Sequence, residues 1–223
     1  GQCFRLLPEG EGRWGLVASG QKLSVAALGE GWFDFDCSQE AFEALWRDYF
    51  DLGRDYRQIC ALVRPEDGYL YEAVRFAGGL RILRQEPFET LISFIISQRK
   101  TLAAIRRCVK LLCEKYGEAI GEHAYAFPAP RALAEASLEG LMACGLGYRA
   151  RYIQQSSRMV LEGRPELNAL GALPDHALLA ALLPLSGVGV KVASCVMLFA
   201  YHRLDAFPVD VWIERVLKKE FPE

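Results

Sequence analysis

Hydrophobic and polar residues follow two different periods along this chain. Within residues 1–36, short apolar stretches are separated by the turn-rich segments "PEGEG" and "SGQ", and Leu23, Val25 and Ala27 recur at every second position. A period of two is typical of a half-buried β-strand, because successive side chains of a strand point to opposite faces. These residues therefore predict a small antiparallel sheet.

Helical spacing begins after Ser38, a residue type suited to cap a helix N-terminus. Apolar residues then follow at helical intervals at Phe42, Leu45, Trp46 and Tyr49. This change of period predicts that helices follow the sheet.

From residue 66 onward nearly the whole chain predicts helices. Pro87 suits the first turn of a long apolar helix, and two further helices are expected over 174–183 and 190–202, joined by the turn "PLSGVG". The predicted fold class is α+β. A small N-terminal antiparallel β-sheet domain with helices (1–85) packs on a helical domain (86–223) that contains a helix-hairpin-helix motif.

Composition and charge add two points. Seven cysteines without a Cys-x-x-Cys pair and only three histidines argue against a zinc site, and indicate free thiols in a reducing, intracellular compartment. That compartment would be the cytoplasm or nucleoid of a bacterium, or the nucleus of a eukaryote. Acidic residues dominate 30–55 and basic residues dominate 99–115, so a basic face for a polyanion is compatible with the net charge of −2.

The segment "PLSGVGVKVASC" (184–195) places two glycines and a lysine directly before an apolar helix. A helix, an L-x-G-x-G turn and a second helix form a helix-hairpin-helix, in which Gly187 and Gly189 permit the tight turn. The N–H groups that open the second helix, around Val190, bind a phosphate whatever the base sequence. A simple corner between two packed helices is the alternative.

A carboxylate follows Lys191 at a sequence distance that suggests the two side chains lie close together. Asp210, in "AFPVDVWIERVL" (206–217), lies 19 residues after Lys191, past one helix and a short connection. Two helices joined in this way return the chain beside its start, so the carboxylate is expected near the amine. Taken alone, the pattern describes an ordinary ion pair equally well.

Four separated segments closely resemble the helix-hairpin-helix DNA glycosylases, and among them the 8-oxoguanine DNA glycosylases. They are "GQCFRL" at the start, "RILRQEPFETLISFIISQ" (81–98), "GLGYRARYIQQSSRMVLE" (145–162), and "LSGVGVKVASC" followed by "FPVDVW". The segments occur in the order of that family, and the resemblance covers essentially the whole chain.

The resemblance implies a bifunctional enzyme of base excision repair that flips 8-oxoguanine out of duplex DNA and excises it. Lys191 would attack C1′ of the sugar to form a Schiff base, and Asp210 would activate the lysine or stabilise the cationic sugar. Partial burial against Val192 and Val196 favours the neutral, nucleophilic amine. The same Schiff base permits β-elimination, which implies an AP-lyase activity.

The resemblance also implies a base pocket and a DNA-binding surface. The pocket would contain the Gly1 carbonyl, which accepts a hydrogen bond from N7–H of 8-oxoguanine, and Cys195, for which a buried core thiol is the alternative. Tyr148 would fill the gap beside the orphaned base, and Arg149 would reach the opposite cytosine. The other predicted DNA-binding residues are Gly187, Gly189, Val190, Gln98, Arg99 and Lys100.

The chain departs from the eukaryotic members of that family at two places. Gln98, Arg99, Lys100 and Ala104 stand where those enzymes have asparagines and an arginine, and Trp212 stands where they have a histidine. Discrimination of the opposite base is therefore expected to be looser or built differently. The family also places a further helix beyond the last residue of this chain.

No cofactor is expected, although the backbone carbonyls of Leu183, Leu185 and Val188 would hold a monovalent or calcium ion, as they do in the family. No iron–sulfur cluster is expected. The expected partner is double-stranded DNA with 8-oxoguanine opposite cytosine, bound by a monomer and away from any membrane. Two alternatives stay open: another glycosylase of the superfamily with a different lesion or opposite-base preference, and a non-catalytic DNA-binding module.

Overall fold

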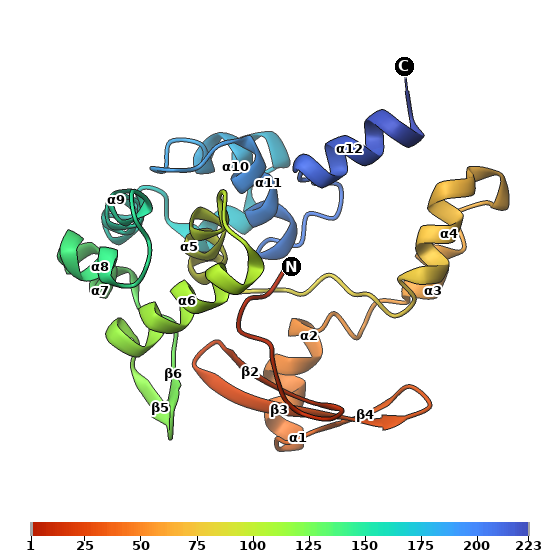
Figure 1. Ribbon diagram of the computed structural model, residues 1–223, viewed down its shortest axis with the longest axis horizontal. Coiled ribbons are helices and arrows are strands. Elements are labelled where there is room, and N and C mark those ends of the chain that lie inside the picture. The colour runs from red at the N-terminus through yellow and green to blue at the C-terminus, as the bar shows by residue number, and fades with distance from the viewer. Residues whose placement is uncertain (1, 223) are drawn as a thin grey trace.

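A computed structural model describes residues 2–222 of the chain, and its four-stranded sheet lies below most of the helices in Figure 1. The sheet is antiparallel, and its strands lie side by side in chain order. The strands are β1 (Leu7–Gly10), β2 (Arg13–Ala18), β3 (Gln21–Gly29) and β4 (Trp32–Phe35). Leu16 of β2 pairs with Leu23 of β3, and both are buried, as the period of two predicts.

The helices follow the sheet, and short 3₁₀- or π-helical segments carry the label η. Those before residue 80 are α1 (Gln39–Ala41), η1 (Phe42–Trp46), α2 (Arg47–Tyr49), α3 (Tyr56–Cys60), η2 (Pro65–Asp67) and α4 (Gly68–Phe76). Those after it are α5 (Pro87–Ser97), α6 (Leu102–Tyr116), α7 (Pro130–Glu135), α8 (Leu138–Ala143), α9 (Arg149–Leu161), η3 (Leu167–Ala172), α10 (Asp175–Leu182), α11 (Val190–Phe199) and α12 (Val211–Glu220). The predicted α+β architecture, a sheet followed by a helical part, is confirmed.

Two local features differ from the expectation. A short hairpin of β5 (Ala119–Gly121) and β6 (Ala124–Tyr125) interrupts the helices, because His123 takes a left-handed φ of 54° that no helix accommodates. The helix expected over 190–202 ends at Phe199 instead. His202 also has a left-handed φ, of 53°, so the chain turns away before it.

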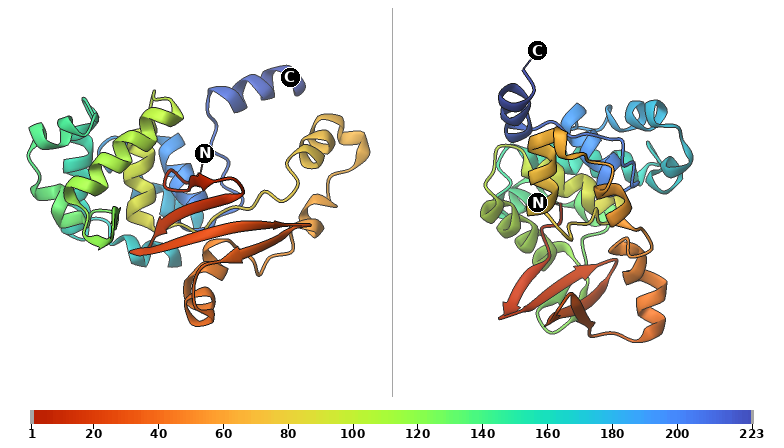
Figure 2. Two further views of the ribbon diagram at one scale, coloured as in Figure 1. Left: turned by 60° about the horizontal axis from the view of Figure 1, so that its bottom comes forward. Right: turned by 90° about the vertical axis from the view of Figure 1, so that its right-hand side faces the viewer.

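Two apolar cores hold the molecule together. In the smaller one, Trp46 is only 1% exposed, packs edge-to-face on Tyr49 and belongs to one cluster with Leu16 and Leu23 of the sheet. The larger one surrounds α5, which is buried along nearly its whole length. Its position among the other helices is visible in both views of Figure 2. The extended segment from residue 80 to 86 joins the two parts, and the predicted boundary after residue 85 lies within it.

A buried ion pair fastens the N-terminal segment to the helices. Arg5 contacts Glu89 of α5 at 3.3 Å and donates to the backbone carbonyl of Tyr125 in β6. Burial raises the pKa of Glu89 to about 7, although the charge of Arg5 acts in the opposite direction. None of the helices within residues 2–222 is long and apolar enough to cross a membrane.

The raised pKa of Glu89 predicts a specific pH dependence of stability. Between pH 4.5 and 7 the folded protein keeps a proton on Glu89 that the unfolded chain has lost, so this residue lowers the free energy of unfolding as the pH rises. From pH 5 to pH 8, urea unfolding should show Glu89→Gln gaining about 2 to 3 kcal/mol relative to the wild-type protein. A difference between the two proteins that does not change with pH would contradict this expectation.

Candidate active site

The turn between α10 and α11 depends on one glycine. Gly187 has a φ of +80°, in the left-handed region that residues with a Cβ rarely adopt. A Cβ at this position would also lie 2.9 Å from the side chain of Tyr152 in α9. Gly189 differs, because its φ is −100° and nothing lies within 4 Å of the position a Cβ would take.

Polar side chains from α9 and from the end of α5 hold this turn from two sides. Gln98 donates from Nε2 to the carbonyl of Gly187 at 2.9 Å. Ser156 donates from Oγ to the carbonyl of Ser186 at 2.8 Å, and the Ser186 hydroxyl donates to Gln155 at 2.7 Å. The start of α11 is therefore fixed relative to two other helices.

The first turn of α11 offers free backbone donors. Gly189 is its N-cap, and Val190 is 64% exposed. The backbone N–H groups of Val190 and Lys191 donate to no other residue within 2–222. Together with the positive end of the helix dipole, they suit an anion such as a phosphate.

Lys191 projects from this turn over an aromatic surface. Its Nζ lies 5.6 Å from the ring centroid of Phe94 in α5. Phe94 stacks on Phe199 at 5.5 Å and meets Phe4 edge-to-face at 5.7 Å. The rings form an apolar floor beneath a partly buried amine, which the sequence predicted only in general terms.

Asp210 begins the next helix. Its Oδ1 accepts hydrogen bonds from the backbone N–H of Trp212 at 2.9 Å and of Ile213 at 3.0 Å, so it caps α12. Its Oδ2 accepts none from the described residues. Lys191 and Asp210 do not approach within 4.0 Å as an ion pair in the part of the chain that the structure describes. This separation between Lys191 and Asp210 is compatible with a substrate atom between the two side chains.

Cys195 shows that the amine and the carboxylate share one neighbourhood. Burial raises the pKa of its thiol to about 11, with the Lys191 charge lowering that pKa and the Asp210 charge raising it. Both charges act on the same buried sulfur, one helical turn from Lys191. Lys191 and Cys195 therefore lie one turn apart on α11, and the charge of Asp210 reaches the same thiol.

A second group of predicted residues lies beyond the turn. Tyr148, at the start of α9, is 56% exposed and contacts the ring of Tyr152 edge-to-face at 5.8 Å. Lys100 donates to the carbonyl of Gly145 at 2.9 Å, which ties the loop after α5 to the loop before α9. Tyr152 also packs against Gly187. Packed side chains therefore connect the exposed ring of Tyr148 to the turn.

Arg149 is placed differently from a residue that reaches out to DNA. It is 6% exposed, and its guanidinium lies 4.4 Å from the ring centroid of Tyr148. It donates to the backbone carbonyls of Leu146 and Gln98. Arg149 therefore supports the tyrosine and the loop after α5.

The remaining predicted site residues are Arg99, Gly1 and the three residues whose carbonyls are predicted to hold an ion. Arg99 is exposed, with a left-handed φ of 51°, and Gly1 lies outside the described residues. The carbonyls of Leu183 and Val188 accept no hydrogen bond from residues 2–222, whereas that of Leu185 accepts one from the Val188 N–H at 3.1 Å. No group of three or more His, Cys, Asp or Glu side chains in the described part of the chain is arranged to hold a metal ion.

Several residues that shape the site were not predicted. Phe94 carries no chemical signal in the sequence, because an apolar residue in an apolar helix resembles any core residue. Gln155 and Ser156 are polar residues on a predicted helix, so the sequence predicts that they lie on the surface. The one available signal is that a tight turn needs hydrogen-bond partners from neighbouring helices.

Comparison with known proteins gives consistent results. The family model described as HhH-GPD superfamily base excision DNA repair protein matches residues 92–221, and that of the 8-oxoguanine DNA glycosylase N-terminal domain matches residues 1–91. A solved structure of the Clostridium acetobutylicum 8-oxoguanine glycosylase/lyase, in complex with DNA containing cytosine opposite 8-oxoguanine, superposes with a TM-score of 0.93 at 35% identity. That similarity covers 99% of this chain and 77% of the other.

Two curated relatives are similar over part of their length. A probable N-glycosylase/DNA lyase of Methanothermobacter thermautotrophicus is 34% identical over 196 residues, which is 78% of this chain and 62% of that protein. The N-glycosylase/DNA lyase of Saccharomyces cerevisiae is 35% identical over 161 residues, which is 64% of this chain and 42% of that protein. The chain thus spans about half the length of these relatives.

The geometry of the turn predicts that its two glycines differ in importance. Gly187→Ala should lower the free energy of unfolding by about 2 kcal/mol, because alanine resists the left-handed φ and its Cβ meets Tyr152. Gly189→Ala is the matched control and should change it by less than about 0.5 kcal/mol. Urea unfolding measures both variants, and equal losses would show that the turn does not depend on Gly187 in this way.

Proposed function

This chain belongs to the HhH-GPD superfamily of base excision DNA repair proteins, and on that premise we propose that it excises 8-oxoguanine from duplex DNA and cleaves the abasic site that remains. The observation that carries the proposal is the placement of Lys191 over an aromatic floor, in the first turn of α11 where backbone N–H groups are free. The names of the similar proteins, glycosylase and lyase, support the same chemistry.

DNA would be held through its backbone first. The free N–H groups of Val190 and Lys191 would bind a phosphate without reading a base, and the turn at Gly187 and Gly189 would let the backbone approach it closely. A cation bound by the carbonyls of Leu183, Leu185 and Val188 would add positive charge beside that phosphate. The free carbonyls of the first and last of these three residues are compatible with such an ion.

Extrusion of the damaged base would depend on Tyr148. Its exposed ring would enter the stack and offset the few kcal/mol that unstacking costs. Arg149 stacks on that ring and would keep it rigid. To reach the opposite cytosine, Arg149 would first have to leave the carbonyls of Leu146 and Gln98.

Residues around the loop after α5 would face the opposite strand. We assign this role to Gln98, Arg99 and Lys100, of which Arg99 is exposed and the other two are tied to neighbouring loops. The flipped base would enter a pocket that includes Cys195, with the carbonyl of Gly1 accepting from N7–H of 8-oxoguanine. Guanine has no hydrogen at N7, so this one contact would distinguish the two bases.

The chemical step would be a displacement at C1′. The lone pair of the Lys191 amine forms a bond to C1′ while the bond from C1′ to N9 of the base breaks, and its electrons leave with the base. The newly bonded nitrogen releases one proton, and the departing base takes up one proton, so the charges balance. Asp210 would stabilise the positive charge that develops on the sugar, using the Oδ2 left free by its capping bonds. Opening of the sugar ring then gives the Schiff base, from which β-elimination expels the 3′ phosphate.

Covalent trapping tests the nucleophile. With a duplex that contains 8-oxoguanine opposite cytosine, borohydride should reduce the Schiff base and link the wild-type protein to DNA. Lys191→Gln should give no adduct, whereas Lys22→Gln should behave like the wild-type protein, because Lys22 is exposed on β3 and lies outside the residues assigned to DNA. An undiminished adduct in Lys191→Gln, or none in the wild-type protein, would overturn the proposal.

The carboxylate can be tested without disturbing its helix. Asparagine caps helices as well as aspartate does, so Asp210→Asn should keep the stability of the protein while it removes the charge. We expect its single-turnover rate of base excision to fall by a factor of about 100 to 1,000. A variant that excises at the wild-type rate would exclude an electrostatic role for Asp210.

A further inference from the structure

The relative position of Lys191 and Asp210 depends on the connection between α11 and α12. Residues 200–209 form no regular structure. Phe207 is 61% exposed and Val209 is 45% exposed, so apolar burial holds the second half of the connection only weakly. The contacts at its beginning must therefore determine where it leads.

Three consecutive side chains anchor that beginning in different directions. Tyr201 donates to the carbonyl of Leu167 in η3 at 2.8 Å. Arg203 donates to the carbonyls of Gly171 and Leu173, both within 3.0 Å. These two residues bind the connection to the helical part, whereas the residue between them points to the part of the chain that carries the sheet.

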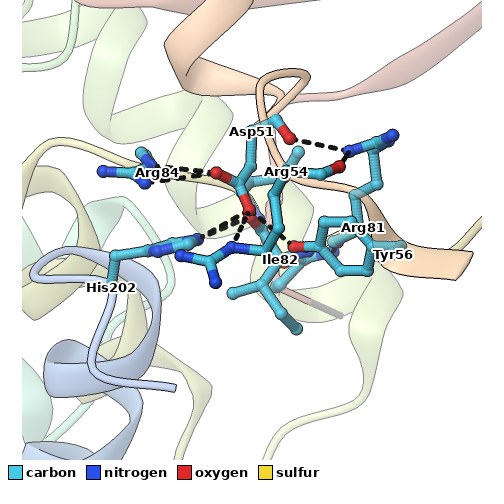
Figure 3. Close-up of polar contacts among 9 residues, drawn as sticks. Asp51, Arg54, Tyr56, Arg81, Ile82, Arg84 and His202 are labelled. Atoms are coloured by element: carbon cyan, nitrogen blue, oxygen red, sulfur yellow. Dashed lines mark hydrogen bonds and ion pairs between the residues drawn. The ribbon is translucent and has the colours of Figure 1, made fainter. Parts of the chain in front are cut away.

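His202 is that middle residue, and it meets a buried carboxylate. Its Nε2 lies 3.3 Å from Oδ2 of Asp51 and 3.3 Å from the carbonyl of Ile82, and its side chain is only 6% exposed (Figure 3). Both partners are acceptors, so Nε2 carries the hydrogen. Burial lowers the pKa of His202, and the nearby Arg84 charge lowers it further, so the neutral ring with its hydrogen on Nε2 fits this site.

Asp51 is itself held rigidly. Its carboxylate accepts from Arg54 at 3.1 Å, from the Tyr56 hydroxyl at 2.9 Å and from Arg84 at 3.2 Å, and its side chain is 4% exposed. Burial acts to raise its pKa, but the hydrogen bonds from Tyr56 and Arg84 and the charge of Arg84 bring that pKa below the ordinary value. The carboxylate therefore stays ionised and supplies a fixed acceptor for His202.

Backbone hydrogen bonds near Asp51 and His202 also fix the start of the connection between α11 and α12. Arg84 donates its N–H to the carbonyl of Tyr49 at the end of α2, and Gln85 donates its N–H to the carbonyl of Phe199, the last residue of α11. His202 has a left-handed φ of 53°, which is unfavourable for a histidine. Such a conformation persists where side-chain contacts outweigh its cost.

We propose that Asp51 and His202 are positioning residues, which hold the connection after α11 so that Asp210 lies in working relation to Lys191. The inference rests on the proposed function and adds that the sheet-bearing part contributes to the geometry of the reaction without touching the substrate. A misplacement of about 1 Å at a reacting group can lower a rate by a factor of about 100. Loss of the contact should therefore affect the rate of excision and leave DNA binding intact.

Two substitutions of His202 separate this contact from the backbone conformation. His202→Gln places an amide N–H where Nε2 lies, so it keeps a donor toward Asp51, whereas the amide of His202→Asn is too short to reach. Asparagine nevertheless tolerates a left-handed φ better than glutamine does. If the contact matters, His202→Gln should be the more active variant. If only the backbone conformation matters, the order should be reversed.

The first readout is kinetic. The single-turnover excision rate of His202→Asn should be ten- to a hundredfold below that of the wild-type protein, and His202→Gln should stay within about threefold. The Kd for a duplex with a non-cleavable abasic-site analogue should be unchanged in both. In an Asp210→Asn background, His202→Asn should cause no further loss, because it acts through Asp210. The proposal is wrong if the two losses add, or if His202→Asn is the more active variant.

The second readout does not depend on activity. In the protein without DNA, amide hydrogen exchange over residues 200–213 should be faster in His202→Asn than in the wild-type protein and unchanged in His202→Gln, with α5 unaffected in both. Equal exchange in all three proteins would overturn the positioning role. A wild-type protein that excises nothing would instead count against the proposed function, and the exchange experiment would still decide the role of His202.

Discussion

The candidate site depends on one constraint, the fixed turn that begins α11. Gly187 is held in a conformation that only glycine adopts readily, with Tyr152 packed against it and Gln98 bonded to its carbonyl. This single arrangement determines three things at once. It leaves the first N–H groups of α11 free, it sets Lys191 over Phe94, and it joins the exposed ring of Tyr148 to the start of α11 through packed side chains.

The other half of the site depends on a longer path. Asp210 begins α12, and its position follows from a connection that is anchored at Tyr201, His202 and Arg203. In the proposed reaction, a short rigid turn would thus position the nucleophile, while a network across the molecule would position the carboxylate. This difference explains how the small sheet, which supplies none of the proposed reacting groups, can still matter for the chemistry. The part of the chain that carries the sheet offers a fixed, buried acceptor at Asp51, just after α2.

The sequence predicts those parts of the site in which residue type and spacing carry the information. Two glycines before a lysine, and an aspartate 19 residues later, are visible without a structure. The burial of Arg149 is not, because one of its two partners is the backbone carbonyl of Gln98, in a loop 51 residues away along the chain. Nor is the contact between Asp51 and His202, which are 151 residues apart and belong to different parts of the fold.

The central claim is that the amine of one particular lysine forms the covalent bond to the sugar. Peptide mass spectrometry of the borohydride-reduced protein–DNA adduct, after nuclease and protease digestion, tests this most directly. We predict that the sugar remnant is found on Lys191 alone. A remnant on any other lysine, such as Lys218 or Lys219 in α12, would contradict the account and require a different active site.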